Sequence, residues 1–188
     1  MKENNWFDPF YIQSHLSEEE RNIQKNVRNF CDNELKPTVV ERNRKNEFDQ
    51  DLYPKFGSLG VLGQTVKTHG GSGTSNLAYG LVAYEFEKID SSYRSAISVQ
   101  SSLVIHPINE FGSQEQKDKY LPQLIKGEKI GCFGLTESEA GSDPTSMKTS
   151  FKKTKDGYIL NGSKNWITNS PIADIFIIWA IEENKDHK

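Results

Sequence analysis

The sequence predicts an α+β multidomain protein: an all-α helical domain over residues 1–128, followed by the start of an antiparallel, β-barrel-like domain over residues 129–188. Three observations lead to this prediction. Up to about residue 128, apolar residues recur at the three- and four-residue spacing of helices. From Ile130 onward, short apolar or alternating runs are separated by glycine-containing dipeptides, which is typical of strands and turns. The composition, 35% hydrophobic and 26% charged, is that of a folded globular protein.

The first helix is expected to begin with a capping box. Ser17 is followed three residues later by Glu20, so that each side chain can bond the other's backbone N–H. Val27 and Phe30 follow at helical spacing until Pro37 interrupts the helix. A short amphipathic segment with several glycines comes next in the chain.

Further helices are expected over the rest of this domain. Ser75 can cap a helix, whose buried face is predicted to contain Leu77, Leu81, Val82 and Phe86. A long helix is predicted over residues 91–112. The last helix is capped by Ser113 and ends at Gly127.

The region after Ile130 is expected to form strands. Residues 130–135 make a short apolar strand, and the dipeptides Asp156-Gly157 and Asn161-Gly162 are predicted hairpin turns. Residues 174–181 are apolar on both faces, as in a fully buried strand. Because this strand would leave an apolar edge uncovered, we expect the chain to be truncated or a fragment of a longer protein.

Charge and cysteine content exclude several classes of function. The net charge is −3 with both signs mixed, so a nucleic-acid partner is not expected. Cys31 and Cys132 show neither disulfide nor zinc spacing. The four histidines are scattered along the chain without the spacing of metal ligands: His15, His69, His106 and His187. No membrane span is expected, and the N-terminus lacks the features of a leader, which favours a bacterial cytoplasm or a processed mitochondrial-matrix form.

The stretch FGLTESEAGSDPTS, residues 133–146, begins as an apolar strand and then becomes polar. Gly141 would let the backbone approach a ligand closely, and the N–H groups around Gly141 and Ser142 could bind an anion. A plain polar loop between strands is the alternative for so short a segment.

The string GLTESEAGSDPTS, from Gly134 to Ser146, resembles the signature of the flavin-dependent acyl-CoA dehydrogenases. NGSKNWITNSPIAD resembles the second flavin-contacting segment of that family, and the likeness extends over almost the whole chain. It implies a helical N-terminal domain, a middle β domain and a C-terminal four-helix domain. This chain would contain the first and about half of the second.

The resemblance implies FAD as cofactor and assigns residues to it. Phe133, Gly134, Leu135 and Thr136 would lie along the pyrimidine edge of the flavin, with Thr136 hydrogen-bonded to it. Gly141 and Ser142 would lie near the pyrophosphate and the CoA thioester arm. Trp166, Ile167 and Thr168 would pack on the isoalloxazine, the Thr168 hydroxyl reaching toward N5. Glu137 would have a structural part, hydrogen-bonded to backbone.

Arg94 is the candidate for substrate recognition. It stands in the first turn of a predicted helix, where a cation opposes the helix dipole, so an anion should neutralise it. Glu87 and Asp90 are nearby candidates, and a substrate carboxylate bound with help from the Ser95 hydroxyl is another. The segment YRSAISVQSSLV resembles the glutaryl-CoA dehydrogenase branch, where Arg94 and Ser95 would hold the γ-carboxylate of glutaryl-CoA with Glu87 close by.

This resemblance implies oxidative decarboxylation of glutaryl-CoA to crotonyl-CoA and CO2. The catalytic glutamate would lie beyond residue 188, so no residue of this chain is assigned as the base and the chain alone should be inactive. An electron-transfer flavoprotein is the implied acceptor and a homotetramer the implied assembly. Three alternatives stay open: an acyl-CoA oxidase, a dehydrogenase for another dicarboxylic acyl-CoA, or a non-catalytic fragment.

Overall fold

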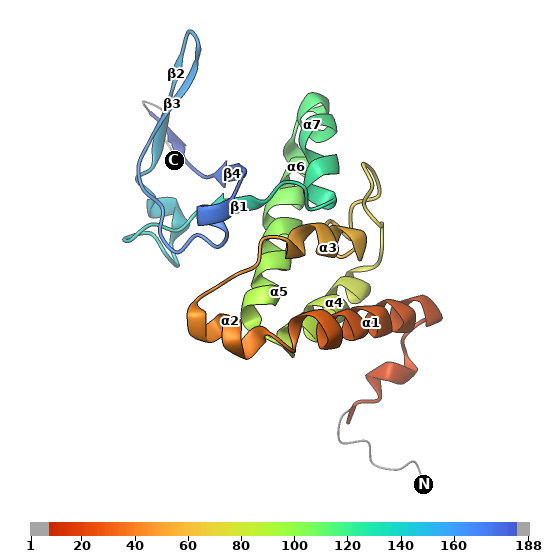
Figure 1. Ribbon diagram of the computed structural model, residues 1–188. Coiled ribbons are helices and arrows are strands. Elements are labelled where there is room, and N and C mark those ends of the chain that lie inside the picture. Colours follow the sequence, from red (N-terminus) through yellow and green to blue (C-terminus); the bar gives the residue numbers. More distant parts are fainter. Residues whose placement is uncertain (1–7, 184–188) are drawn as a thin grey trace.

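A computed structural model of the chain describes residues 8–183 and shows a helical region followed by a region of short strands (Figure 1). This order agrees with the predicted fold class. The helices are α1 (Glu18–Phe30), α2 (Val39–Lys45), α3 (Leu52–Ser58), α4 (Asn76–Glu87), α5 (Ser91–Ser98), α6 (His106–Phe111) and α7 (Gln114–Ile125), with π-helical segments at Cys31–Leu35 and Val99–Ile105. The strands are β1 (Gly131–Gly134), β2 (Ser150–Thr154), β3 (Gly157–Asn161), β4 (Ile175–Ile178) and β5 (Ile181–Glu182).

The predicted helix starts are confirmed. Ser17 and Glu20 form a complete capping box at the start of α1, because each side chain accepts a hydrogen bond from the other's backbone N–H. Ser113 and Gln116 do the same for α7. Ser75 Oγ accepts from the third residue of α4. These contacts are short in sequence and fix where each helix begins. Every helix within residues 8–183 is too short or too polar to span a bilayer.

Helix α5, the second π-helical segment and α6 form one continuous rod through the molecule (Figure 1). The π-helical part packs against β1, where a Cβ on Gly131 would lie only 2.4 Å from Val104 Cγ1. The buried side chain of Gln100 donates to the carbonyls of Leu124 and Lys129 and accepts from Gly131 N at 2.8 Å. This amide therefore ties the first strand to the helical region.

The buried core lies in the helical region. Phe56 is at its centre, with ring centroids 5.3 Å from Phe86 and 6.0 Å from Phe30. From β4, Ile175 and Ile177 pack on the edge of this core, and Cys132 of β1 is fully buried. Helix packing therefore supplies most of the apolar burial in this chain.

The predicted apolar face of α4 needs a correction. Leu77 is 48% exposed, whereas Leu81, Val82 and Phe86 are buried as expected. Glu85, a charged residue, is also buried on this face. Glu85 is buried because α1 packs on this part of α4 and its Arg28 and Gln24 side chains donate to the carboxylate.

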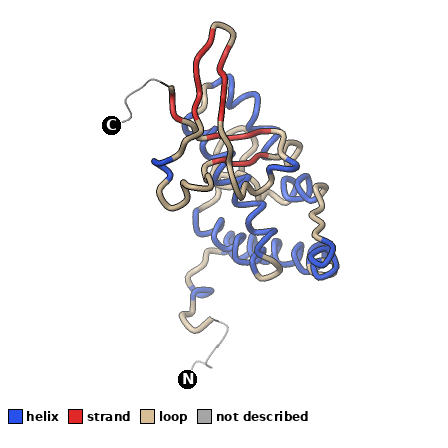
Figure 2. Tube along the Cα trace, turned by 90° about the vertical axis from the view of Figure 1, so that its left-hand side faces the viewer, coloured by secondary structure: helices blue, strands red, loops and turns tan. Residues whose placement is uncertain are grey.

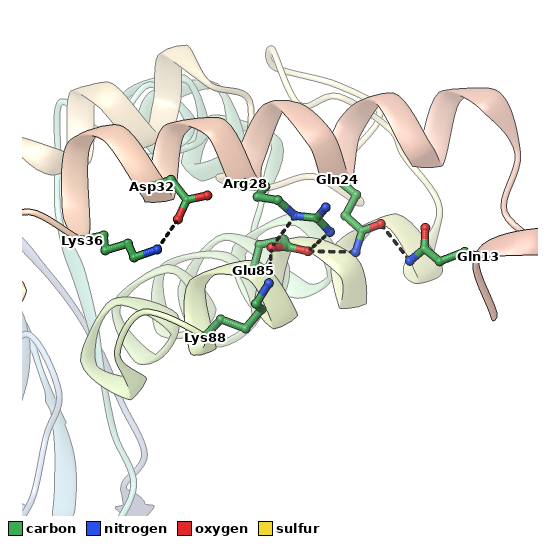
Figure 3. Close-up of polar contacts among 7 residues, drawn as sticks. All are labelled: Gln13, Gln24, Arg28, Asp32, Lys36, Glu85 and Lys88. Atoms are coloured by element: carbon green, nitrogen blue, oxygen red, sulfur yellow. Dashed lines mark hydrogen bonds and ion pairs between the residues drawn. The ribbon is translucent and has the colours of Figure 1, made fainter. Parts of the chain in front are cut away.

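The Glu85 carboxylate is held between α1 and α4 by three side chains (Figure 3). Arg28 donates to both carboxylate oxygens, at 2.8 and 3.2 Å, and Gln24 Nε2 donates at 2.8 Å. Lys88 Nζ lies 3.4 Å from Oε2. Burial acts to raise the pKa of Glu85, but the bonds and charges of Arg28 and Lys88 outweigh it, so the pKa lies below its ordinary value.

The strands pair in two small sheets. β2 and β3 form an antiparallel hairpin, as predicted, and both views show it projecting away from the helices (Figures 1 and 2). Its two-residue turn is Lys155-Asp156, one position earlier than predicted, because Gly157 already pairs with Thr154 as the first residue of β3. The expected antiparallel arrangement is wrong for the other pairs, since β1 pairs in parallel with β4, and β2 in parallel with β5.

The second predicted hairpin turn is also wrong. After Asn161-Gly162 the chain does not turn back as a neighbouring strand. It runs without strand structure to Asp174, passing through a 3₁₀ turn at Ser170–Ile172. A two-residue turn would have paired the next strand antiparallel with β3, whereas after this connection β4 pairs with β1 instead.

The prediction of one fully buried strand over residues 174–181 is wrong too. The segment is divided into β4 and β5, and Phe176 and Trp179 are each 52% exposed. Ile175 and Ile177 point to the helical core, and because side chains alternate along a strand, Phe176 faces away from it.

Candidate cofactor- and substrate-binding site

The polar stretch after β1 begins with a closed turn. Glu137 and Ala140 exchange both backbone hydrogen bonds, at 3.1 and 3.2 Å. The chain then runs through Gly141 and Ser142, both exposed, to Asp143, whose carboxylate accepts from Thr145 N and starts a 3₁₀ turn. The turn thus places an exposed glycine and hydroxyls immediately beside the end of β1.

Residues 164–169, here called the strap, lie along β1 and are hydrogen-bonded to the backbone near both ends of that strand. Asn165 N donates to Thr136 O at 2.9 Å, and Lys164 Nζ donates to Leu135 O at 2.8 Å, just beyond the strand. At the strand's start, Asn169 Nδ2 donates to Gly131 O at 3.1 Å. The two segments predicted to contact the flavin, residues 133–136 and 166–168, are therefore side by side.

The strap has a strained backbone at Trp166, where φ is +61°. For a bulky side chain this left-handed conformation costs on the order of 1–3 kcal/mol. The indole is 92% exposed, Thr168 is exposed and Ile167 is half-buried. The attachments at the two ends of the strap hold this conformation, which presents Trp166 and Thr168 outward.

A buried ion pair lies beneath the strap. Lys164 Nζ is 2.8 Å from Glu137 Oε1, and the two side chains are 8% and 9% exposed. The carboxylate also accepts from the backbone N–H groups of Lys148 and Thr149, at 2.7 and 2.9 Å. Led by Lys164, these bonds lower the pKa of Glu137 to about 2. The expectation that Glu137 has a structural part bonded to backbone is confirmed.

The residues of this surface fit a flavin. Phe133 and Leu135 are half-buried, Gly134 is buried, and Thr136 is half-exposed, its Oγ1 making no hydrogen bond to another described residue. No described atom lies within 4 Å of a Cβ built on Gly141. A planar ring system with a polar edge needs neutral donors and an apolar wall, and an attached phosphate needs backbone N–H groups and hydroxyls. The donor set present is of that kind.

Arg94 lies on α5 and already has an anionic neighbour. Its Nε donates to Glu87 Oε2 at 2.7 Å, and the side chains are 38% and 45% exposed. Ser91 and then Arg94 lower the pKa of Glu87. Nη1 lies 3.5 Å from Ser98 Oγ, while Nη2 makes no hydrogen bond to a described residue. The structure does not bring the Ser95 hydroxyl to the guanidinium; the Ser98 hydroxyl occupies that place.

The helix that carries Arg94 continues into the π-helical segment that packs against β1. Gln100, which holds Gly131 N, follows Arg94 by six positions, about 9 Å along a helix. Arg94 and the residue that holds the start of β1 therefore lie on the same continuous helical rod. Asp90 does not neutralise Arg94; its carboxylate caps α5 by accepting from Ser92 N.

Several residues of this region were missed by sequence reasoning. Lys164 and Asn169 were not assigned although both stand in the quoted NGSKNWITNSPIAD string. Ser98 stands four positions after Arg94, a spacing that places two helical residues on one face. That spacing was a usable signal, whereas nothing local indicates that Lys164 is buried.

The remaining candidates have structural explanations. Cys31 and Cys132 are buried free thiols, and burial raises the pKa of Cys31 to about 12. His69 lies 2.9 Å from Asp118 on the surface, and His187 lies outside the described residues. Within residues 8–183 no group of three His, Cys, Asp or Glu side chains could hold a metal ion.

Comparison with known proteins identifies the family. Residues 17–128 match "Acyl-CoA dehydrogenase, N-terminal domain", and residues 132–188 match "Acyl-CoA dehydrogenase, middle domain". Mitochondrial isovaleryl-CoA dehydrogenase of Pongo abelii is 41% identical over 168 residues, 88% of this chain and 40% of that protein. The short-chain specific acyl-CoA dehydrogenase of Clostridium acetobutylicum is 38% identical over 169 residues, 89% of this chain and 45% of that protein.

Among solved structures, a glutaryl-CoA dehydrogenase from Mycobacterium smegmatis in complex with FADH2 superposes with a TM-score of 0.91 at 42% identity, covering 93% of this chain and 45% of that one. The chain thus spans less than half the length of the relatives it matches. Two adjoining family domains account for nearly all of its residues, and the chain belongs to the acyl-CoA dehydrogenase family.

Proposed function

We propose that this chain supplies the flavin-binding and acyl-binding surfaces of an FAD-dependent glutaryl-CoA dehydrogenase, which converts glutaryl-CoA to crotonyl-CoA and CO2. The observation that supports this substrate is Arg94, a cation on the helical rod that packs against β1, whose Nη2 makes no hydrogen bond to a described residue. The Mycobacterium smegmatis glutaryl-CoA dehydrogenase supports the same choice by its likeness over 93% of this chain.

The cofactor we propose is FAD, which supplies the acceptor for the hydride that leaves the substrate. Thr136 would bind the pyrimidine edge through its backbone N–H and hydroxyl, with Phe133, Gly134 and Leu135 alongside. Trp166 and Ile167 would cover the ring system and exclude water, and the Thr168 hydroxyl would donate near N5. Gly141 and Ser142 would hold the phosphate and thioester arm. The exposure of Trp166, Thr168 and Ser142 in the structure supports this assignment.

Arg94 would bind the far carboxylate of the substrate through its Nη1 and Nη2 edge, because Glu87 already occupies Nε. Glu87 thereby holds the guanidinium in one orientation, and Ser98 or Ser95 can add a hydroxyl donor. A straight-chain acyl group would leave the arginine without its carboxylate, which costs binding free energy and favours the diacid.

The proton at the α carbon needs a carboxylate base of suitable pKa. Glu137 is a poor candidate, because a group with a pKa of about 2 that already accepts three hydrogen bonds has little basicity to offer. We therefore place the base outside residues 8–183, in agreement with the family resemblance.

A dehydrogenase for a monocarboxylic acyl-CoA is the second candidate. The Arg94–Glu87 pair favours it, since a neutralised arginine does not require a substrate carboxylate. The isovaleryl-CoA and short-chain relatives have nearly the same identity to this chain as the glutaryl-CoA dehydrogenase.

The test is Arg94→Gln in the complete polypeptide in which this sequence occurs. Loss of a hydrogen bond to a charged group should lower kcat/KM for glutaryl-CoA by about 10- to 100-fold and leave that for butyryl-CoA unchanged. Arg21→Gln, an exposed arginine on α1, is the control. Equal values for wild type and Arg94→Gln on glutaryl-CoA would favour the monocarboxylic substrate.

The remaining assignments follow from the family resemblance. We propose a domain boundary between residues 128 and 129, an electron-transfer flavoprotein as acceptor, and a homotetrameric assembly. A bacterial cytoplasm is the proposed compartment, with the mitochondrial matrix as the alternative, since both mitochondrial and bacterial relatives occur. Sedimentation of the complete polypeptide tests the assembly.

A further inference from the structure

The attachment of the strap to the end of β1 depends on one buried ammonium group. Lys164 Nζ donates to Leu135 O and to Glu137 Oε1, both at 2.8 Å, and its side chain is 8% exposed. Its Cγ lies 3.4 Å from a Cβ built on Gly134, so its stem passes directly over that glycine. Lys164 therefore contacts the strand end and the turn that follows it at the same time.

These contacts fix the backbone on both sides of Thr136. A peptide unit is planar, so holding the carbonyl of Leu135 also fixes the direction of the Thr136 N–H, which points the opposite way from that carbonyl. The next peptide unit is held as well, because Asn165 N donates to Thr136 O. With both units held, the N–H and the hydroxyl of Thr136 have set directions.

We propose that Lys164 is a positioning residue for the flavin, aiming the donors of Thr136 and setting the spacing between residues 133–136 and 166–168. This inference rests on the proposed function, since it assumes that a flavin lies against both segments. Lys164 itself faces Leu135 O and Glu137 and acts through Thr136.

A purely structural role is the competing explanation. Breaking a buried ion pair leaves one charge uncompensated and destabilises the fold, whereas removing both charges together can be nearly neutral. The variant pair Lys164→Met and Lys164→Met/Glu137→Gln separates the two explanations. The double variant has no unpaired buried charge, yet it still lacks the donor to Leu135 O.

Lys148 provides a matched control in the same region. Its Nζ lies 2.5 Å from Glu139 Oε2, but these side chains are 77% and 73% exposed. Its bond to Glu137 is made by the backbone N–H and survives a side-chain substitution. Lys148→Met thus removes a lysine–glutamate pair without touching the strap.

The experiment titrates FAD into the apoprotein of the complete polypeptide and follows the fluorescence of the flavin. Amide hydrogen exchange of Asn165, whose N–H donates to Thr136 O, is a second measurement that needs no flavin. We expect Lys164→Met to raise the Kd for FAD about tenfold or more and to speed Asn165 exchange. Lys148→Met should change the Kd less than about twofold. In the double variant the unfolding midpoint should recover while the Kd stays raised.

Two results overturn the inference: a Kd within twofold of wild type in Lys164→Met, or a double variant in which FAD affinity recovers together with stability. If Lys164→Met does not fold, the Kd of the double variant is compared with that of wild type instead. If the wild-type apoprotein takes up no FAD, the proposed function fails, and the exchange of Asn165 still reports whether Lys164 holds the strap.

Discussion

The helical region, residues 18–125, and the strand region, residues 131–182, are held together by different interactions. The helices bury an aromatic and aliphatic core that includes Phe56, whereas the strands leave Phe176 and Trp179 half exposed. The strand region instead depends on polar contacts near β1, made by Gln100, Lys164 and Asn169. Apolar burial gives stability without direction, and hydrogen bonds give direction with less net stability.

Each region also contains one buried carboxylate. Glu85 joins α1 and α4 (Figure 3), and Glu137 lies directly beneath the strap. We infer that the first serves mainly the stability of the fold and the second mainly the geometry of the site. Substitutions in the two regions should therefore differ in what they change.

The largest expected effect is that of Phe56→Ala. The ring is fully buried and contacts three other aromatic rings, so its removal should lower the free energy of unfolding by about 3–5 kcal/mol. Urea denaturation followed by circular dichroism measures this. Phe111→Ala, at a residue 86% exposed, is the control and should change stability by less than about 0.5 kcal/mol. Equal effects would mean that the core does not centre on Phe56.

Glu85→Gln should have a smaller effect on stability. The amide would turn donor groups toward Arg28 and Gln24, which are themselves donors, at a cost of about 1.5–3 kcal/mol. Glu41→Gln, which removes an exposed pair with Lys45, should cost less than about 0.5 kcal/mol. FAD affinity should stay unchanged in both. A loss of FAD affinity in Glu85→Gln would break the distinction drawn between the two carboxylates.

The third prediction concerns the acid titration of Glu137. Its folded-state pKa, about 2, lies below the ordinary 4.5, so its contribution to stability is complete above about pH 4.5 and is lost as the pH falls toward 2. NMR of the side-chain carboxyl carbon, with the Glu137 signal assigned by Glu137→Gln, should show protonation with a midpoint near pH 2. In Lys164→Met this midpoint should rise toward pH 4.5. A wild-type midpoint near 4.5 would mean that the pair with Lys164 does not form.

Local features of the fold were predictable from the sequence. The capping box at Ser17 and Glu20 and the hairpin of β2 and β3 involve residues within a few positions of each other, so the pattern contains nearly the whole interaction. The parallel pairing of β1 with β4 joins residues about 44 positions apart. No short pattern encodes such a pairing.

The candidate site shows the same limit. The motif segments containing Thr136 and Trp166 could be picked out from the sequence, and the structure brings them side by side. The burial of Lys164 could not be predicted, because it depends on β1 and the strap meeting in space. Likewise, whether Ser95 or Ser98 accompanies Arg94 depends on side-chain directions on α5.

The most direct measurement is the anaerobic addition of glutaryl-CoA to the FAD-loaded complete polypeptide, observed by visible absorption. We expect glutaryl-CoA to bleach the flavin band of the wild-type protein and Arg94→Gln to slow this bleaching about tenfold or more. Two results would contradict the account: a polypeptide that binds no FAD, or a bound flavin that is bleached by butyryl-CoA and not by glutaryl-CoA.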